Sequence, residues 1–425
     1  MITAIAVVFV LTLSVGMPIA ICLGMSSFIA LIGSELPFRL IAERMFNSVN
    51  SFPLMAIPLF MIIGEIMDSA GILNRLIGFA QCFVGHVRGG LAQVTTITEM
   101  ILSGVSGTAV GDAAALSATL LPAMKKEYGV EFASAVVASA ASIGPIIPPS
   151  AAMVVYSFMS GGMVSVAGLF LAGVVPGIMI GVGMMFLNYY IAKKRGYPVS
   201  QRLSIRDLIV RTKEAFFILM MPIVVLGGIV GGIFTATEGA AVGVVYSIVI
   251  GFFVTRELKF QHIWRALVNG MVTSGVVLLL VALASSVTFL LTIEQLPNTL
   301  GTFLRSLTTS PVMFILLVNV LLIFVGMLLE STAAYIMLVP ILAPIASVYG
   351  IDPLHFGFLF VFNLVIGMLT PPVGVVLFVV GGYAGLSIER LTRAVFPYIV
   401  VQYAVLGLCI VFPKGYLFLP RLFGY

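Results

Sequence analysis

Long apolar runs separated by short polar stretches dominate the chain. A membrane-spanning helix needs about 20 consecutive apolar residues, whereas strands of a membrane β-barrel alternate over segments of about 10 residues. Runs of the first kind prevail here, so we expect helices throughout, crossing the membrane about ten to twelve times. The pattern does not decide whether 215–254 forms one broken span or two. The charge-free runs are 1–34, 132–192, 215–237, 239–255, 266–293, 306–329, 331–351, 353–388 and 394–413.

Composition excludes a water-soluble protein. Hydrophobic residues make up 61% of the 425 residues and charged residues only 9%, against about a quarter in soluble chains. The net charge of +5 is scattered, so no nucleic-acid partner is expected and the lipid bilayer is the main environment. The uncharged segment 1–34 lacks the basic region of a signal peptide and is predicted to remain as a span. The predicted fold class is an all-α polytopic membrane protein.

A basic segment divides the chain into two halves that resemble each other. Loops rich in lysine and arginine usually stay in the cytoplasm, so this segment is predicted to be cytoplasmic. Asp207 is its only acid, and its basic residues are Lys193, Lys194, Arg195, Arg202, Arg206, Arg211 and Lys213. Motifs then recur in the same order, which indicates a repeat. Two related halves around a midplane site are typical of secondary transporters, and we expect the repeats to be inverted. The matched positions, offset by 218 to 224 residues, are Phe38 and Phe260, Thr108 and Thr332, Pro122 and Pro340, Pro148 and Pro371, and Pro176 and Pro397.

Two glycine-rich and hydroxyl-rich segments predict re-entrant hairpins. The first, 103–112, lies between apolar arms at 91–102 and 113–124, and the second, 326–334, lies between arms at 312–325 and 335–348. Unwound backbone exposed to lipid would leave polar groups unpaired, so both tips should be buried in protein or line a wet cavity. Small residues for close helix packing are the alternative. Glu330 at the second tip is expected to be a functional or structural anchor.

Proline-rich segments predict two interrupted helices. Pro145, Pro148 and Pro149 fall within 144–150, and Pro371 and Pro372 fall within 370–374. Proline removes a backbone donor and blocks the i−4 hydrogen bond, which frees carbonyl groups. Half-helix N-termini attract an anionic substrate, while free carbonyl and hydroxyl oxygens suit a hard cation such as Na⁺. Simple kinks for packing are the alternative.

Several acids in apolar surroundings are predicted to have structural roles, although proton coupling through one of them stays open. An enzyme is not expected. The G-x-S-G pattern at 104–107 matches rhomboid-type proteases, but His86, His262 and His355 fall at apparent span ends and the second half would have no role. Nucleotide-binding and metalloprotease motifs are absent from the sequence, so this chain does not power transport by hydrolysing ATP. The acids are Glu65, Asp68, Glu99, Asp112, Glu238 and Glu294.

Over essentially its whole length the chain resembles the large membrane subunit, or DctM-like permease, of tripartite ATP-independent periplasmic (TRAP) transporters. The resemblance rests on the segments 16–20, 103–115, 144–150, 234–242 and 370–374. It implies an elevator-type carrier of the ion-transporter superfamily, with a scaffold and a mobile transport domain in each half. It also implies two partners, a small four-span membrane subunit on a separate chain and a periplasmic solute-binding protein.

These observations lead to a domain plan with the scaffold at 1–90 and 214–310. The transport domain is expected at 91–192, with a hairpin at 91–124, and at 311–425, with a hairpin at 312–348. A cytoplasmic linker covers 193–213. The amphipathic segments 38–46 and 259–268 are predicted to be the arms between fixed and moving parts.

The predicted function is Na⁺-coupled import of an organic acid, such as sialic acid or a C4-dicarboxylate, across the bacterial inner membrane. A stand-alone symporter and a channel are the alternatives. Two or more Na⁺ ions are expected, with ligands among Ser103, Ser106, Gly107, Gly144, Pro145, Gly326, Thr332, Ala333 and Thr370. The residues expected to contact the substrate are Thr108, Ser150, Ser331 and Gly374.

Overall fold

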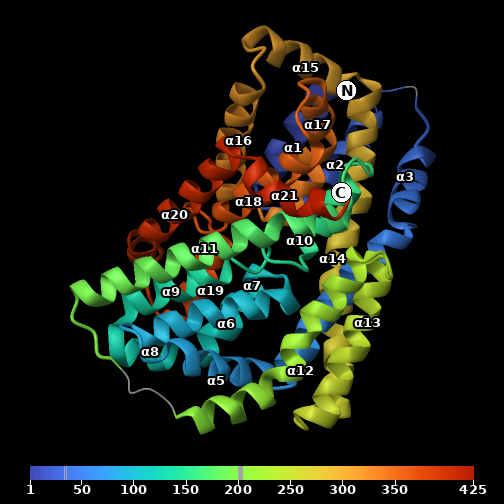
Figure 1. The fold of residues 1–425 in the computed structure, drawn as a ribbon. Helices are drawn as coiled ribbons and strands as arrows, with labels where there is room; N and C mark the ends of the chain where they lie inside the picture. The colour runs from blue at the N-terminus through green and yellow to red at the C-terminus, as the bar shows by residue number, and fades with distance from the viewer. Residues whose placement is uncertain (33, 35, 200–203) are drawn as a thin grey trace.

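The computed structural model describes residues 1–32, 34, 36–199 and 204–425, and the regular structure in these ranges is helical (Figure 1). Nearly all of the chain therefore satisfies its backbone polar groups within helices, as lipid requires. The α-helices of the first half are α1 Ile2–Ser14, α2 Ile19–Ile32, α3 Arg39–Val49, α4 Ala56–Ser69, α5 Ile72–Val84, α6 Gly90–Ser106, α7 Ala109–Thr119, α8 Leu121–Tyr128, α9 Val130–Ala141, α10 Ala151–Met159 and α11 Val166–Lys194. Those of the second half are α12 Ile205–Val230, α13 Ala236–Val249, α14 Phe260–Ile293, α15 Leu296–Leu307, α16 Pro311–Leu328, α17 Ser331–Val348, α18 Pro353–Gly367, α19 Val375–Ala384, α20 Ile388–Val411 and α21 Lys414–Leu422.

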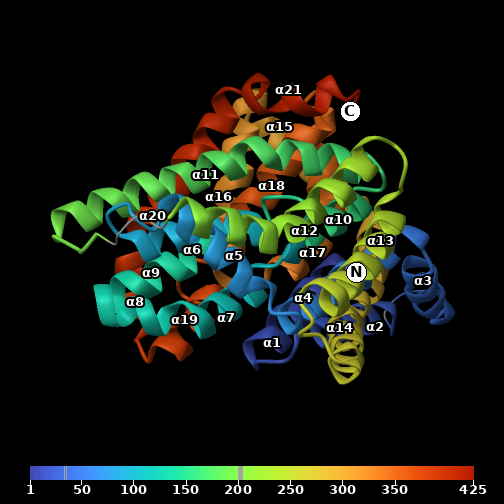
Figure 2. The same ribbon diagram turned by 60° about the horizontal axis from the view of Figure 1, so that its bottom comes forward.

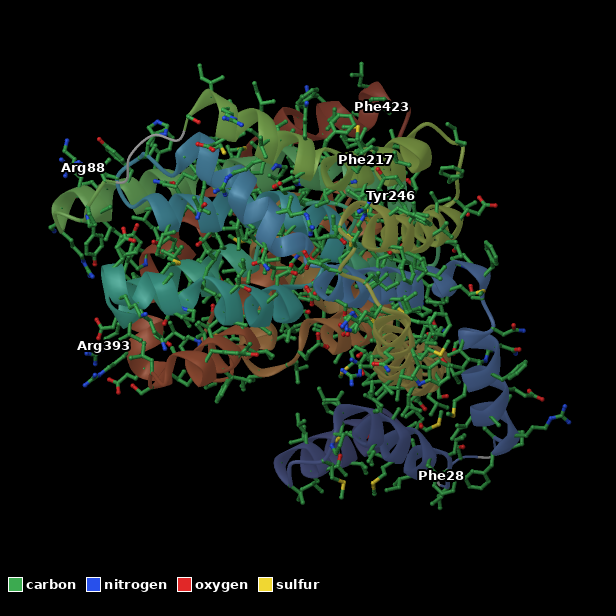
Figure 3. All side chains as sticks on the ribbon, turned by 90° about the horizontal axis from the view of Figure 1, so that it is seen from below. Phe28, Arg88, Phe217, Tyr246, Arg393 and Phe423 are labelled. Carbon is green, nitrogen blue, oxygen red and sulfur yellow. The ribbon has the colours of Figure 1, made fainter. Side chains whose placement is uncertain are left out.

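The predicted fold class, an all-α polytopic membrane protein, is confirmed. Among the described residues, eight helices are long and apolar enough to cross a membrane, and six shorter apolar helices accompany them. The region 215–254 contains two such helices, α12 and the α13 helix that continues into a π-helical turn at Ile250–Val254, so it supplies two spans. Large apolar side chains point outward over much of the surface, among them Phe28, Phe217 and Phe423 (Figure 3).

The two halves use the same succession of elements. Each has a helical hairpin (α6–α7 and α16–α17), an interrupted helix (α9–α10 and α18–α19) and then a long helix (α11 and α20). The halves also pack reciprocally, because α10 lies against α17 while α19 lies against α7. The peptide bonds Pro148–Pro149 and Pro371–Pro372 are both cis. The repeat seen in the sequence is therefore a repeat of structure.

The hairpins and interrupted helices form one group of helices, which meets α4 and α14 where α4 packs on α6 and α10 and where α14 packs on α17. Figure 2 shows α3, α13 and α14 on one side of the molecule and α8, α9 and α19 on the other. Helix α4 packs against both α13 and α14, whereas α9 packs against α6, α7 and α20. This arrangement leaves a boundary between two groups of helices, and the candidate site lies at that boundary.

The predicted arm segments differ from each other in the structure. Residues 39–49 form the separate helix α3, none of whose residues is buried, but 260–268 is the beginning of the 34-residue helix α14. The elements directly before the two hairpins are instead α5 and α15. Helix α5 follows α4, and α15 follows α14.

The basic linker is shorter than the segment 193–213 that the charge pattern predicted. Helix α11 continues to Lys194, and α12 begins at Ile205. Ser204 starts α12 because its hydroxyl accepts a hydrogen bond from the Asp207 amide at 3.2 Å, while the Asp207 carboxylate accepts one from the Ser204 amide at 3.2 Å. The predicted linker residue Arg202 lies outside the described residues.

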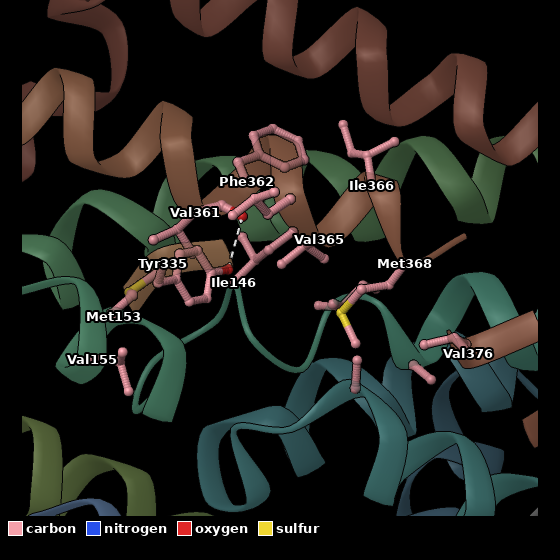
Figure 4. Packing of buried hydrophobic residues seen from close by; sticks show 14 of the residues in the cluster. Ile146, Met153, Val155, Tyr335, Val361, Phe362, Val365, Ile366, Met368 and Val376 are labelled. Atoms are coloured by element: carbon pink, nitrogen blue, oxygen red, sulfur yellow. Dashed lines mark hydrogen bonds between the residues drawn. The ribbon is translucent and has the colours of Figure 1, made fainter. Parts of the chain in front are cut away.

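The centre of the protein is packed with apolar side chains from both halves. Around Tyr335 these include Ile146, Met153, Val361 and Phe362 (Figure 4). The Tyr335 hydroxyl donates a hydrogen bond to the Val361 carbonyl at 3.4 Å, so α17 and α18 are tied together without an unpaired buried hydroxyl.

Candidate functional site

Both hairpin tips open onto one cavity of about 590 Å³. The first tip contributes residues 106–112 and the second contributes 330–332. Helix α10 and Met368 complete this side of the cavity, and α4 and α14 form the opposite wall. The described lining residues are Ile57, Met61, Gly64, Glu65, Asp68, Ser106, Gly107, Thr108, Ala109, Val110, Gly111, Asp112, Pro145, Ala151, Ala152, Val155, Gly270, Val272, Thr273, Val276, Val277, Leu280, Glu330, Ser331, Thr332 and Met368.

The first tip is much narrower than the unwound segment predicted over 103–112. Helix α6 continues to Ser106 and α7 begins at Ala109, so only Gly107 and Thr108 break the helix. Gly107 ends α6 with a left-handed φ of 62°, a conformation that glycine adopts without strain. The prediction was wrong because small and hydroxyl residues are compatible with a buried helix: the Ser103 hydroxyl donates to the Met100 carbonyl at 3.0 Å.

The second tip is also a two-residue break, Leu329 and Glu330, within the predicted segment 326–334. Glu330 is the N-cap of α17, and its carboxylate accepts a hydrogen bond from the Ala333 amide at 3.3 Å. The hydroxyls of Ser331 and Thr332 donate to the same carboxylate at 3.2 and 2.9 Å. These contacts give Glu330 a structural role as the anchor of the tip, because the carboxylate stabilises the positive end of the helix.

The two proline-rich interruptions lie where the sequence predicted them. Residues 142–150 separate α9 from α10, and residues 368–374 separate α18 from α19. Each packs on the hairpin of its own half. A Cβ at Gly144 would lie 2.5 Å from the Asp112 carboxylate and 2.9 Å from the Thr108 carbonyl. In the second half, the Val373 amide donates to the Met327 carbonyl at 3.1 Å.

The structure brings only part of the predicted site to the cavity. The predicted residues that line it are Ser106, Gly107, Thr108, Pro145, Ser331 and Thr332. A second group, Ser103, Gly144, Ser150 and Ala333, is buried directly behind the tips and breaks. The others, Gly326, Thr370 and Gly374, are not among the described lining residues.

Those three outlying residues have packing or backbone contacts. Gly326 faces Gly367 of α18 so closely that a Cβ on Gly326 would lie 3.0 Å from the Gly367 Cα. The Thr370 hydroxyl donates to the Ile366 carbonyl at 3.0 Å. Gly374 precedes α19 with a left-handed φ of 53°. These contacts do not involve the cavity, so the roles of the three residues in binding stay predictions.

Sequence reasoning assigned no site role to Glu65 and Asp68, which line the cavity from α4. Residues three apart share one face of a helix, so this spacing was a usable signal. The α14 wall contributes Thr273, and nearby Asn269 donates to the Glu65 carboxylate at 3.2 Å. Asp112, for which the sequence favoured a structural role and left proton coupling open, lines the cavity and accepts a hydrogen bond from the Ser106 hydroxyl at 2.7 Å.

Buried polar contacts tie the hairpin side of the cavity into one unit. Asn188 on α11 donates to Thr96 on α6 at 3.0 Å and accepts a hydrogen bond from Tyr398 on α20. Gln402 on α20 donates to the Ser142 hydroxyl, next to the first interruption, at 2.8 Å. Because satisfied buried hydrogen bonds are costly to break, these contacts hold elements of both halves together.

Comparison with known proteins decides the family. The family profile described as "Tripartite ATP-independent periplasmic transporter, DctM component" matches residues 5–415. The chain belongs to this DctM family of TRAP transporters. It is therefore the large permease subunit of such a system, as the sequence motifs predicted.

Named relatives of this DctM protein are transporter permeases. The sialic acid TRAP transporter large permease protein SiaM of Vibrio cholerae is 39% identical over 386 residues, which cover 90% of each chain. The C4-dicarboxylate TRAP transporter large permease protein DctM of Rhodobacter capsulatus is 36% identical, with 96% of each chain covered. The isethionate TRAP transporter permease protein DctMQ of Oleidesulfovibrio alaskensis is 40% identical over 94% of this chain but only 63% of its own length.

A solved structure supports the fold alone. The Alcanivorax borkumensis YdaH transporter, whose structure is described as having an unusual topology, is 14% identical and superposes with a TM-score of 0.69 over 98% of this chain and 99% of that one.

The relatives' names also disfavour the protease alternative, and the Ser106 hydroxyl donates to the Asp112 carboxylate rather than to a histidine.

Proposed function

We propose that the chain carries out Na⁺-coupled import of an organic acid that a periplasmic solute-binding protein delivers. It would act in the bacterial inner membrane together with a small four-span subunit. The observation that carries the proposal is the convergence of both hairpin tips on one cavity. Two related halves that meet at such a site are the usual arrangement of secondary transporters.

Oxygen atoms at the tips and interruptions are suited to Na⁺. The hydroxyls of Ser106 and Thr332 lie at the cavity, and the backbone carbonyls of Gly107 and Pro145 belong to segments without regular hydrogen bonding. Hard cations prefer such oxygen ligands. Since each hairpin packs on the interruption of its own half, we propose at least one Na⁺ per half, with Ser103, Gly144 and Ala333 in the supporting layer.

The walls of the cavity support an elevator motion. One wall comes from hairpins and interrupted helices that buried hydrogen bonds join, and the other comes from α4 and α14. A substrate held between them would change its exposure when the first wall slides along the second. We propose α5 and α15 as the connecting arms, in place of 38–46 and 259–268, because they directly precede the hairpins.

The substrate class follows from the relatives by analogy. Their names specify sialic acid, isethionate, C4-dicarboxylate and 2,3-diketo-L-gulonate, all of which are organic acids. An organic acid is therefore the class we propose here.

The test is uptake by the complete transporter in proteoliposomes. The acid that copurifies with the partner solute-binding protein is radiolabelled and supplied with that protein outside the vesicles. We expect uptake that needs both the binding protein and an inward Na⁺ gradient. Uptake without the binding protein would indicate a stand-alone symporter, and uptake that ignores the Na⁺ gradient would contradict Na⁺ coupling.

A further inference from the structure

The two proposed arms, α5 and α15, lie at opposite ends of the molecule (Figure 1). Each leads from a helix of one cavity wall, α4 or α14, to a hairpin of the other wall. On the first of these sides, α13 and α14 pack on α4 and α12 packs on α13; these four helices are called the scaffold group below. In an elevator motion each arm must either stay with the scaffold group or travel with its hairpin.

Helix α5 is joined to the scaffold group by Arg75. The Arg75 guanidinium donates to the Thr255 carbonyl at 3.0 Å and pairs with the Glu257 carboxylate at 2.9 Å. Thr255 follows the π-helical turn that ends α13, and carbonyls at such a helix end lack a donor within the helix and attract a cation. Gly71, directly before α5, leaves room for this pair, because a Cβ there would overlap the Glu257 carboxylate.

A second contact joins α5 to α12. Arg211 on α12 donates to the Gln81 side chain on α5 at 3.3 Å. Its guanidinium lies over Gly78, where a Cβ would come within 2.7 Å of it. Helix α5 also packs on α6 of the first hairpin, but the polar side-chain contacts that it makes with other described elements lead to the scaffold group.

Helix α15 is joined to the second hairpin instead. Arg305 donates to the carbonyl of Val348, the last residue of α17, at 2.9 Å, and its Cζ lies 5.9 Å from the centre of the Tyr349 ring. The Tyr349 hydroxyl donates to the carbonyl of Thr308, which follows α15, at 3.0 Å. Each arm thus places an arginine on a carbonyl at the C-terminal end of a helix. That helix belongs to the scaffold group for α5 and to the hairpin for α15.

The backbone at the other end of each arm can turn. Gly85, Gly89 and Gly90 lie where α5 passes into the first hairpin, and Gly89 has a left-handed φ of 70°. Gln295, between α14 and α15, has a left-handed φ of 56°, which is unfavourable for a residue with a side chain. Hinges are a few residues at the ends of elements that absorb large changes in φ and ψ. Both junctions have this character.

We propose that the two arms hinge at opposite ends. Helix α5 stays with the scaffold group, and the first hairpin turns about residues 85–90. Helix α15 travels with the second hairpin and turns about Gln295. This inference rests on the proposed elevator motion and adds an asymmetry between the two related halves. The competing arrangement is symmetrical, with both arms in the scaffold, as the domain plan from the sequence has them, or both moving with their hairpins.

The experiment joins pairs of engineered cysteines in the complete transporter, reconstituted in proteoliposomes. Hg²⁺ bridges two close thiols and dithiothreitol removes it, so each pair provides its own unbridged control. The measured quantity is Na⁺-dependent uptake of the acid that copurifies with the binding protein. The native cysteines are first replaced by alanine; they are Cys22, Cys82 and Cys409.

Three pairs are used, each with one cysteine at a glycine that faces a neighbouring helix. They join α5 to α12, α15 to α17, and, as the control for a blocked motion, α6 of the first hairpin to α12. The Cβ atoms at these glycines would lie 3.7, 3.9 and 3.1 Å from the nearest carbon of the partner's aliphatic stem, so the thiols can share one Hg²⁺. The pairs are Gly78→Cys with Arg211→Cys, Gly301→Cys with Ile345→Cys, and Gly104→Cys with Pro222→Cys.

The inference predicts a different result for the arms and for the control. Bridging α6 to α12 should lower uptake at least about tenfold, because a hairpin tied to the scaffold group cannot complete the motion. Bridging α5 to α12, or α15 to α17, should leave uptake within about twofold of the unbridged pair, because each bridge joins parts that move as one. Loss of uptake with the α5 bridge would show that α5 moves against the scaffold group. Loss with the α15 bridge would show that α15 moves against its hairpin. Either loss overturns the inference.

A second measurement does not depend on the activity of the cysteine variants. Structures of the wild-type transporter are determined with the cavity open to each side of the membrane. The contacts of Arg75 with Thr255 and of Arg305 with Val348 should persist in both. Separation of either pair in one of the two structures overturns the inference.

Failure of the proposed function has its own result. If uptake does not depend on Na⁺, or if bridging α6 to α12 leaves it unchanged, the proposed function or its elevator motion falls and the inference falls with it. If that control bridge blocks Na⁺-dependent uptake and an arm bridge blocks it too, only the inference is wrong.

Discussion

The close contact between α16 and α18 makes a quantitative prediction. A Cβ on Gly367 would lie 2.6 Å from the Cα and 2.7 Å from the carbonyl carbon of Gly326. Carbon atoms in contact normally stay about 3.5–4.0 Å apart. Both partners are backbone, so no side chain can rotate away and Gly367→Ala must separate the helices by roughly 1 Å.

This separation should cost about 1–3 kcal/mol, the usual penalty for overpacking. Gly407→Ala in α20 is the matched control, because a Cβ there meets nothing within 4 Å. Alanine in that helix interior should be neutral or should stabilise by up to about 1 kcal/mol. Unfolding of the purified transporter by SDS titration in mixed micelles measures both variants.

The second readout is the stabilisation that Na⁺ gives to each variant. Because α16 leads directly to the second tip, Gly367→Ala should also reduce this Na⁺-dependent stabilisation, whereas Gly407→Ala should retain it. If Gly367→Ala is as stable as Gly407→Ala and responds equally to Na⁺, the close contact between α16 and α18 neither stabilises the protein nor positions the tip.

Three further predictions concern the tips and the contacts behind them. Ser106→Ala and Thr332→Ala should each raise the Na⁺ concentration for half-maximal uptake about tenfold, the effect of losing about 1.4 kcal/mol of binding; unchanged Na⁺ activation would remove these residues from the ion sites. Gln402→Met should destabilise by about 1 kcal/mol, and in a double-mutant cycle its effect should not add to that of Ser142→Ala; additive losses in SDS unfolding would show that the two groups are not coupled. Lys125→Met should destabilise by about 0.5–1 kcal/mol, because Lys125 donates to the last carbonyls of α19 at 3.1 and 2.8 Å; an effect that persists unchanged in high salt would argue against this charge–dipole contact.

The fold and the interruptions were predictable because lipid leaves few options for a polar backbone. Apolar run lengths indicated helices, and the prolines at 148–149 and 371–372 marked both interruptions correctly. The length of each tip was overestimated. Composition cannot distinguish an unwound segment from a buried helix in which serine hydroxyls bond to the preceding turn, as at Ser103.

The opposite wall of the cavity was harder to predict. Glu65 and Asp68 lie about forty residues before the first tip in the sequence, and only tertiary packing brings α4 to that tip. The connecting arms stay a prediction, because amphipathic character occurs in several helices. Their position relative to a hairpin depends on where α4 and α14 end, and periodicity locates helix ends poorly.

Two cryo-electron microscopy maps of the complete transporter, one in Na⁺ and one with choline at the same ionic strength, would show whether the hairpin tips bind Na⁺. We expect, in the Na⁺ map only, ion density between the oxygens of the tip and of the interrupted helix in each half, near Ser106 and near Thr332. Well-resolved tips without such density, in a sample that still shows Na⁺-dependent uptake, would contradict it.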